Sequence, residues 1–206
     1  MSLTIPRVRA ADGPPPDRSA LPDPGVTAAA ASVVDSVRTG GDVALSEASR
    51  RFGGGPVGTS PRIPPATLAE AQRSLDAPTI DALSDAIANV RTVHAPQRPV
   101  DTTVVPSDGV TVERRWTPLS SVGVYVPGGR AIYPSSLIMG VVPARVAGVE
   151  RIVVATPARP DGTIDPIVLA AAALLDVDEV YAMGGAQAVA ALAYGTETID
   201  RVDKIV

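Results

Sequence analysis

Residues 120–136, SSVGVYVPGGRAIYPSS, decide the fold class of this chain of 206 residues. The β-branched run at 122–126 predicts a buried strand, and the PGG triplet at 127–129 ends it in a tight turn. In α/β proteins, a glycine-rich turn after a strand is where phosphates and dinucleotides bind. Here the chain continues as RAIYPSS, without the third glycine of the dinucleotide fingerprint. The stretch is therefore a nucleotide site, a plain turn, or a nucleotide loop of a different build.

Beyond Pro118, strand-like and helix-like segments alternate along the chain. We expect strands at 122–126, 151–155, 179–183 and 204–206, with helices at 135–147, 164–175 and 186–194 between them. This alternation predicts an α/β fold with a parallel βαβαβαβ sheet and right-handed crossovers. Ligands bind at the carboxyl ends of such strands, and the loop that should follow the last strand is missing. We therefore expect a truncated protein.

We expect residues 1–117 to form a helical region followed by a hairpin, as part of a larger domain. Residues 118–206 are expected to form a second domain. The helices are expected at 26–37, ending at Gly40-Gly41, at 42–52 with Asp42 as its cap, near PPATLAEAQRSL, and at 79–95. The stretch TTVVPSDGVTVERRW predicts the hairpin, with its turn at Asp108-Gly109.

Composition excludes several classes of partner and site. The net charge of −4 and pI near 5.0 leave no dense basic face for nucleic acid. The absence of cysteine excludes disulfides, thiolate nucleophiles and cysteine-ligated metals. No secretory signal is visible, and the longest apolar run, 167–175, is too short for a bilayer. We expect a cytoplasmic protein with no membrane partner.

Three further features of the sequence have plain structural interpretations. A literal G-x-G-x-x-G occurs at Gly53, Gly55 and Gly58, but it follows a helix and no helix follows it, so we expect a flexible linker. The single histidine, His94, lies on the apolar face or at the end of the 79–95 helix and predicts a structural role. The carboxylates at Asp176, Asp178 and Glu179 are expected to be solvated, and no metal-ligand cluster is evident.

The PGG turn has a counterpart two strands later, in the stretch MGGAQ at 183–187. Tyr125 would offer a ring and Arg130 a charge at the first loop, while Gln187 would offer an amide in the first turn of the following helix. Two glycine pairs at carboxyl ends of one sheet favour a ligand site. The alternative is that both pairs are only turns, chosen for backbone freedom.

Long stretches of the chain resemble histidinol dehydrogenase. The resemblance runs from Val26 to Val206 and is most specific in VYVPGG, in GGAQA with ALAYGTE, and in VDKIV, while VRTGGDVALSEASRRF and NVRTVHAPQ fit the family's helical region. It implies an incomplete Rossmann-like fold, related to aldehyde dehydrogenases, that binds NAD without the usual glycine fingerprint. It also implies oxidation of L-histidinol through histidinal to L-histidine, in two NAD-dependent hydride transfers. The PGG turn would then be a nucleotide loop of a different build.

The resemblance assigns site residues by motif. Tyr125 and Gln187 match the family's NAD-contacting tyrosine and glutamine. A third NAD contact, the asparagine of a GPGN run, follows KIV in the family, and this chain has ended there. The zinc ligands and the Glu-His pair that does the acid–base work also lie further on, so no catalytic or metal-binding residue maps onto this chain. The resemblance further implies that the full-length protein is a homodimer.

Two alternatives remain open at this stage. The chain would also fit a family relative that oxidises another small alcohol, because specificity residues would lie in the missing half. It would equally fit a nucleotide-binding or scaffold module without chemistry.

Overall fold

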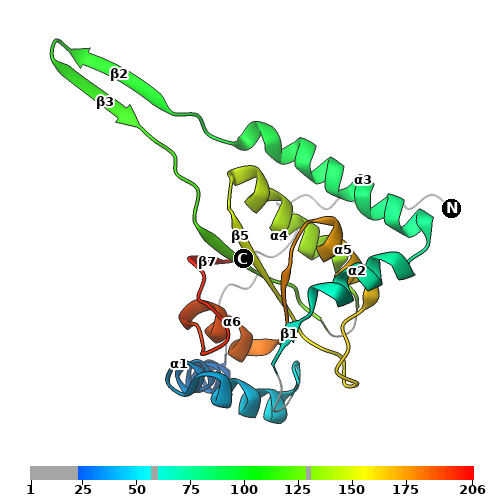
Figure 1. Cartoon of the computed structure of the whole chain (residues 1–206). Coiled ribbons are helices and arrows are strands. Elements are labelled where there is room, and N and C mark those ends of the chain that lie inside the picture. The colour runs from blue at the N-terminus through cyan, green and yellow to red at the C-terminus, as the bar shows by residue number, and fades with distance from the viewer. Residues whose placement is uncertain (1–22, 57–59, 129–130) are drawn as a thin grey trace, which may run out of the picture.

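The computed structural model describes residues 23–56, 60–128 and 131–206 (Figure 1). Five strands form its main sheet in the order β1-β6-β5-β4-β7. Their bounds are Arg62–Ile63 (β1), Ser121–Tyr125 (β4), Arg151–Thr156 (β5), Glu179–Ala182 (β6) and Lys204–Ile205 (β7). Strands β4 to β7 pair in parallel, as the alternating pattern predicts. The antiparallel edge strand β1 was not predicted, because two residues between prolines show no period.

The order of the strands places β4 in the interior of the sheet. The chain moves from β4 to β5 and β6 on one side, then returns to add β7 on the other side of β4. The register aligns Val124 with Val154 across β4 and β5, and Gly123 with Ile205 across β4 and β7. The carboxyl ends of the parallel strands therefore share one edge of the sheet.

Helices cover both faces of this sheet. The bounds are Pro24–Phe52 (α1), Pro65–Ser74 (α2), Ala77–His94 (α3), Pro134–Ala147 (α4), Pro166–Leu174 (α5) and Gly185–Tyr194 (α6), with a 3₁₀ turn at Ala95–Gln97. Helices α2 to α5 pack on the face that presents Val122 and Val124, and α1 and α6 pack on the other face with Tyr125. In Figure 1, α1 and α6 lie at the bottom. Side chains alternate along β4, so each face has its own apolar core.

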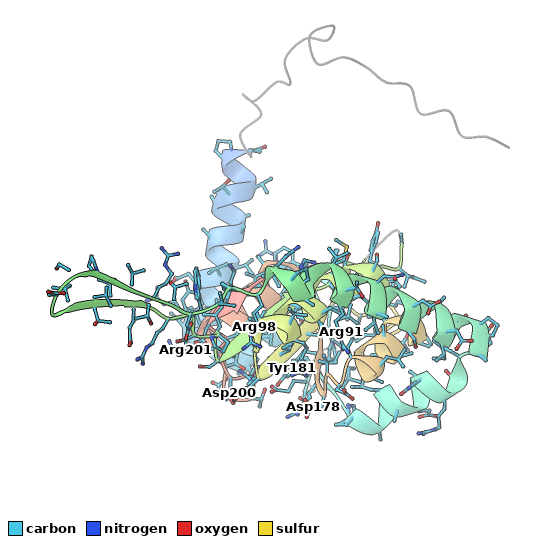
Figure 2. All side chains as sticks on the ribbon, turned by 90° about the horizontal axis from the view of Figure 1, so that it is seen from above. Arg91, Arg98, Asp178, Tyr181, Asp200 and Arg201 are labelled. Atoms are coloured by element: carbon cyan, nitrogen blue, oxygen red, sulfur yellow. The ribbon has the colours of Figure 1, made fainter. Side chains whose placement is uncertain are left out.

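The first turns of α1 are exposed and project from the body of the molecule (Figure 2). Further along, Gly41 breaks the helical geometry with φ 53° and ψ −137°. The predicted helix break at Gly40-Gly41 is thus found as a kink inside α1. The expected cap differs, because the Asp42 N–H donates to the Glu197 carboxylate at 2.7 Å. The Asp42 carboxylate instead accepts a hydrogen bond from the Thr198 hydroxyl at 3.0 Å.

This cap makes the stability of the fold sensitive to acid. Accepting the Asp42 N–H lowers the pKa of the Glu197 carboxyl below its usual value. A lowered pKa in the folded state contributes stability above the unfolded-state pKa, and this contribution is lost as the pH falls through the folded-state value. We expect Glu197→Gln to flatten the decline of the urea midpoint below about pH 5, near and under the usual glutamate pKa. Glu70→Gln, at an exposed site on α2, serves as the control and should leave the pH profile unchanged.

A two-stranded hairpin stands apart from the main sheet. Strands β2 (Thr102–Ser107) and β3 (Val110–Arg114) pair antiparallel around a turn at Asp108-Gly109, as predicted, and Gly109 has φ +76°. Every residue of both strands is exposed, and the hairpin extends well away from the helices (Figure 1). Among the residues that the structure describes, no helix is both long and apolar enough to cross a membrane.

Candidate functional site at the carboxyl edge of the sheet

Glycines gather where β4, β5 and β6 end. Gly128 follows β4, Pro157 follows β5, and Gly184 and Gly185 follow β6. A groove of about 330 Å³ opens between these connections. Its lining includes Gly53, Gly54, Gly128, Pro157, Arg159 and Gln187. Residues Gly129 and Arg130, which belong to the predicted first loop, lie outside the described part of the chain.

Tyr125 is the last residue of β4 and is half-buried on the α1 and α6 face. Its hydroxyl accepts a hydrogen bond from the Gly185 N–H at 3.1 Å. Its own N–H donates to the Val206 carbonyl at 2.8 Å. The side chain of Tyr125 is therefore tied to the start of α6, and its backbone is tied to the last residue of the chain.

Gln187 lies in the first turn of α6, with only 2% of the residue exposed. Its amide nitrogen donates to the Gly53 carbonyl at 3.2 Å. Its amide oxygen lies against Gly185, where a Cβ would come within 2.7 Å of it and where φ is +70°. The structure thus brings Tyr125 and Gln187 together at Gly185. Gln187 lines the groove directly, whereas Tyr125 reaches this point through its hydroxyl, and their role in NAD binding stays a prediction.

The glycine run after α1 contributes a wall that sequence reasoning missed. We expected Gly53 and Gly55 to belong to a flexible linker, and Gly58 lies outside the described residues. Instead, the Gly54 carbonyl accepts the Ala158 N–H at 3.1 Å. A Cβ on Gly54 would lie 3.3 Å from the Gly184 Cα. The sequence around this glycine run does not indicate the contact with Gly184, because Gly54 and Gly184 are 130 positions apart. The only local signal of a close approach is the run of glycines itself.

Arg159 supplies a positive charge at the groove. Its guanidinium pairs with the Asp165 carboxylate, and its side chain is 46% exposed. Asp165 is also the N-cap of α5, since its other oxygen accepts the Ile167 N–H at 2.9 Å. The rim thus carries one partly exposed cation beside the buried Gln187 amide, and a positive charge at this place suits an anionic ligand.

The ionisable residues weighed in the sequence lie elsewhere. His94 ends α3, where its Nδ1 is 2.9 Å from the Gln97 amide oxygen. Glu179, expected to be solvated, is paired with Arg151 at 2.8 Å at the amino edge of the sheet, where Arg151 also donates to the Arg201 carbonyl. No group of three or more His, Cys, Asp and Glu side chains that could hold a metal occurs among the residues described.

Comparisons with known proteins give one consistent family. The family model for histidinol dehydrogenase matches residues 17–206. The histidinol dehydrogenase of Geobacillus kaustophilus is 46% identical over 173 residues, and that of Nocardia farcinica is 48% identical over 200 residues. A crystal structure of histidinol dehydrogenase from Elizabethkingia anophelis superposes with a TM-score of 0.81 at 29% identity and covers 87% of this chain.

The matches cover most of this chain but less than half of each relative. They take in 84% and 91% of this chain, but only 41% of the Geobacillus protein and 45% of the Nocardia protein. The crystal structure is likewise covered over 41% of its length. Because the family model matches nearly the whole sequence, the chain belongs to the histidinol dehydrogenase family.

Proposed function

We propose that this chain forms the NAD-binding side of a zinc-dependent histidinol dehydrogenase. The longer protein would oxidise L-histidinol through histidinal to L-histidine, with NAD as the hydride acceptor. The observation that carries the proposal is the glycine rim at the carboxyl edge of the sheet, where Tyr125 and Gln187 meet at Gly185. Carboxyl ends of parallel strands are the usual place for a nucleotide in open α/β sheets.

The strand order supports a Rossmann-like domain. With β4 taken as the first strand of the unit, the order β6-β5-β4-β7 corresponds to 3-2-1-4 of the dinucleotide-binding fold. The return of the chain across β4 creates the switch point beside Tyr125 and Val206. The relation to aldehyde dehydrogenases is part of the same proposal.

The residues present fit NAD in part and do not fit zinc. The groove of about 330 Å³ lies at the small end of the usual range for ligand pockets, roughly 300–1,000 Å³, so it suits one portion of a dinucleotide. Gln187 would orient the bound nucleotide, and Tyr125 would hold the start of α6 in place. The lone His94 lies away from this groove, so zinc ligands and acid–base groups would come from residues beyond this chain.

We further propose that the longer protein is a cytoplasmic homodimer. The exposed hairpin supports the homodimer, because an isolated two-stranded hairpin is only marginally stable and the valines of this hairpin are exposed. At its base, an apolar groove of about 960 Å³ is lined by Trp116, Met139 and Val206, among others. A large open apolar surface of this kind marks contact with further polypeptide.

The test is a protein in which this chain is extended by the part of the Nocardia farcinica relative that it lacks. We expect NADH formation from L-histidinol. Gln187→Ala should raise the KM for NAD by about tenfold, the effect of losing one to two hydrogen bonds, and leave the KM for histidinol nearly unchanged. Glu70→Ala on α2 is the control. A folded protein that reduces NAD only with another small alcohol, or with none, would favour one of the two alternatives.

A further inference from the structure

Pro157 lies at the centre of the glycine rim. It directly follows β5, which stands between β4 and β6 in the sheet. Glycines from three separate connections approach its ring: Gly54 after α1, Gly128 after β4 and Gly184 after β6. We propose that Pro157 is a positioning residue that sets the spacing of these three loops and hence the shape of the groove.

The distances to Pro157 show why glycine is needed at two of these positions, Gly128 and Gly184. A Cβ on Gly128 would lie 2.5 Å from the Pro157 Cγ, and a Cβ on Gly184 would lie 2.6 Å from the Pro157 Cβ. Gly54 is less crowded by the ring, with 3.6 Å to the Pro157 Cβ. Gly184 has φ −136° and ψ 176°, an extended conformation that any residue adopts. Close approach to the proline, rather than backbone freedom, therefore explains the glycine at 184.

The backbone around Pro157 is tied to the same loops. On one side, the Thr156 carbonyl accepts the Met183 N–H at 2.9 Å. On the other, the Ala158 N–H donates to the Gly54 carbonyl at 3.1 Å. The ring fixes φ of Pro157 and removes its N–H, so the residue places a rigid surface between the loops without leaving a donor unpaired. Rigid supporting residues are what hold a binding site in its working geometry.

Only the identity of the ligand, NAD, rests on the proposed function. The spacing of the loops by Pro157 does not depend on it. Pro157 itself lines the groove together with Gly128 and Gly184. Truncating its ring would let these two loops move closer together or apart. We therefore expect Pro157→Ala to weaken NAD binding about three- to tenfold, about 1 kcal/mol by the usual conversion. Pro65→Ala, at the exposed start of α2, is the control and should leave binding unchanged.

A double-mutant cycle tests the contacts without any ligand. Pro157→Ala removes the Cγ and Cδ atoms and keeps the Cβ. Gly128→Ala clashes with the Cγ but lies 3.6 Å from the Cβ, whereas Gly184→Ala clashes with the Cβ itself. In urea unfolding, Pro157→Ala should rescue Gly128→Ala, restoring the folding equilibrium constant about tenfold or more, and should fail to rescue Gly184→Ala.

The outcomes separate this proposal from the proposed function. Rescue of both glycine variants, or of neither, would overturn the positioning role of the ring whatever the ligand. Selective rescue of Gly128→Ala together with weaker NAD binding in Pro157→Ala would support it. Selective rescue with unchanged NAD affinity would show that Pro157 only stabilises the fold, and would overturn its role at the site. If the unmodified chain binds no NAD, the proposed function fails, and the cycle still decides whether Pro157 spaces the loops.

Discussion

The chain of 206 residues by itself is expected to form no NADH when it is given L-histidinol and NAD. Hydride transfer from an alcohol needs a group that takes up the hydroxyl proton, within hydrogen-bond reach of the substrate. The groove presents Gln187 and Arg159, and neither is a base at neutral pH. His94 is engaged with Gln97 at the end of α3. The chain also spans only 41% of the Geobacillus relative and 45% of the Nocardia relative.

The measurement is the growth of NADH absorbance with purified protein, zinc, NAD and L-histidinol. A full-length relative, such as the Geobacillus enzyme, is the positive control, and heat-denatured chain gives the background. General acid–base catalysis alone contributes about 10²- to 10⁴-fold to a rate, so its loss should bring the signal to background. A rate clearly above the heat-denatured control would contradict the expectation and require a catalytic group within this chain.

Gly41→Ala is expected to destabilise the fold strongly. At φ 53° and ψ −137°, an alanine is strained, at a cost of roughly 1–3 kcal/mol. The new Cβ would also clash with a carboxylate oxygen of Glu197. Glu197 would have to move and release the Asp42 N–H, so this hydrogen bond would be lost as well. We expect a loss of about 1–3 kcal/mol in the free energy of unfolding, mainly from the backbone strain.

Gly53→Ala, at the residue that caps the end of the same helix, provides a matched control. Gly53 also has a positive φ, 78°, with ψ −166°, but a Cβ there would meet nothing within 4 Å. Urea unfolding of both variants separates backbone strain from the contact with Glu197. Equal losses for the two variants would show that Glu197 adds nothing at the kink. A loss at Gly41 that Glu197→Ala relieves would show that the carboxylate is the obstacle.

The parallel sheet could be predicted from the sequence because its signals are local. The strands and helices after Pro118 differ from the expected bounds by one or two residues, since apolar period and turn residues mark each one. Tyr125 and Gln187 were found as site candidates by the same reasoning, from glycine pairs at strand ends. Their convergence at Gly185 depends on the order of the strands in the sheet. The alternation of strands and helices along the chain does not determine that order.

The features that were missed depend on contacts distant in sequence. Glu197 caps Asp42 across 155 positions, and no residue near Asp42 indicates it. The glycines after α1 look like a linker because their partners, Gly184 and Ala158, lie in other connections. Pro157 belongs to no sequence motif, and only its contacts in the folded structure show that it lies among the glycines. Such contacts follow from the tertiary arrangement and not from propensity.

NAD titration by NMR on the isotope-labelled chain tests most directly whether the glycine rim is the nucleotide half of the site. We predict weak binding, in the millimolar range or about −4 kcal/mol, because this groove suits only part of the dinucleotide. Shifts should appear at the amides of Gly54, Gly128 and Gly185 and at the Gln187 side chain. No change at these signals, or changes confined to the Trp116 groove, would contradict the claim. Tight binding would show that this half holds NAD unaided, against the account of an incomplete site.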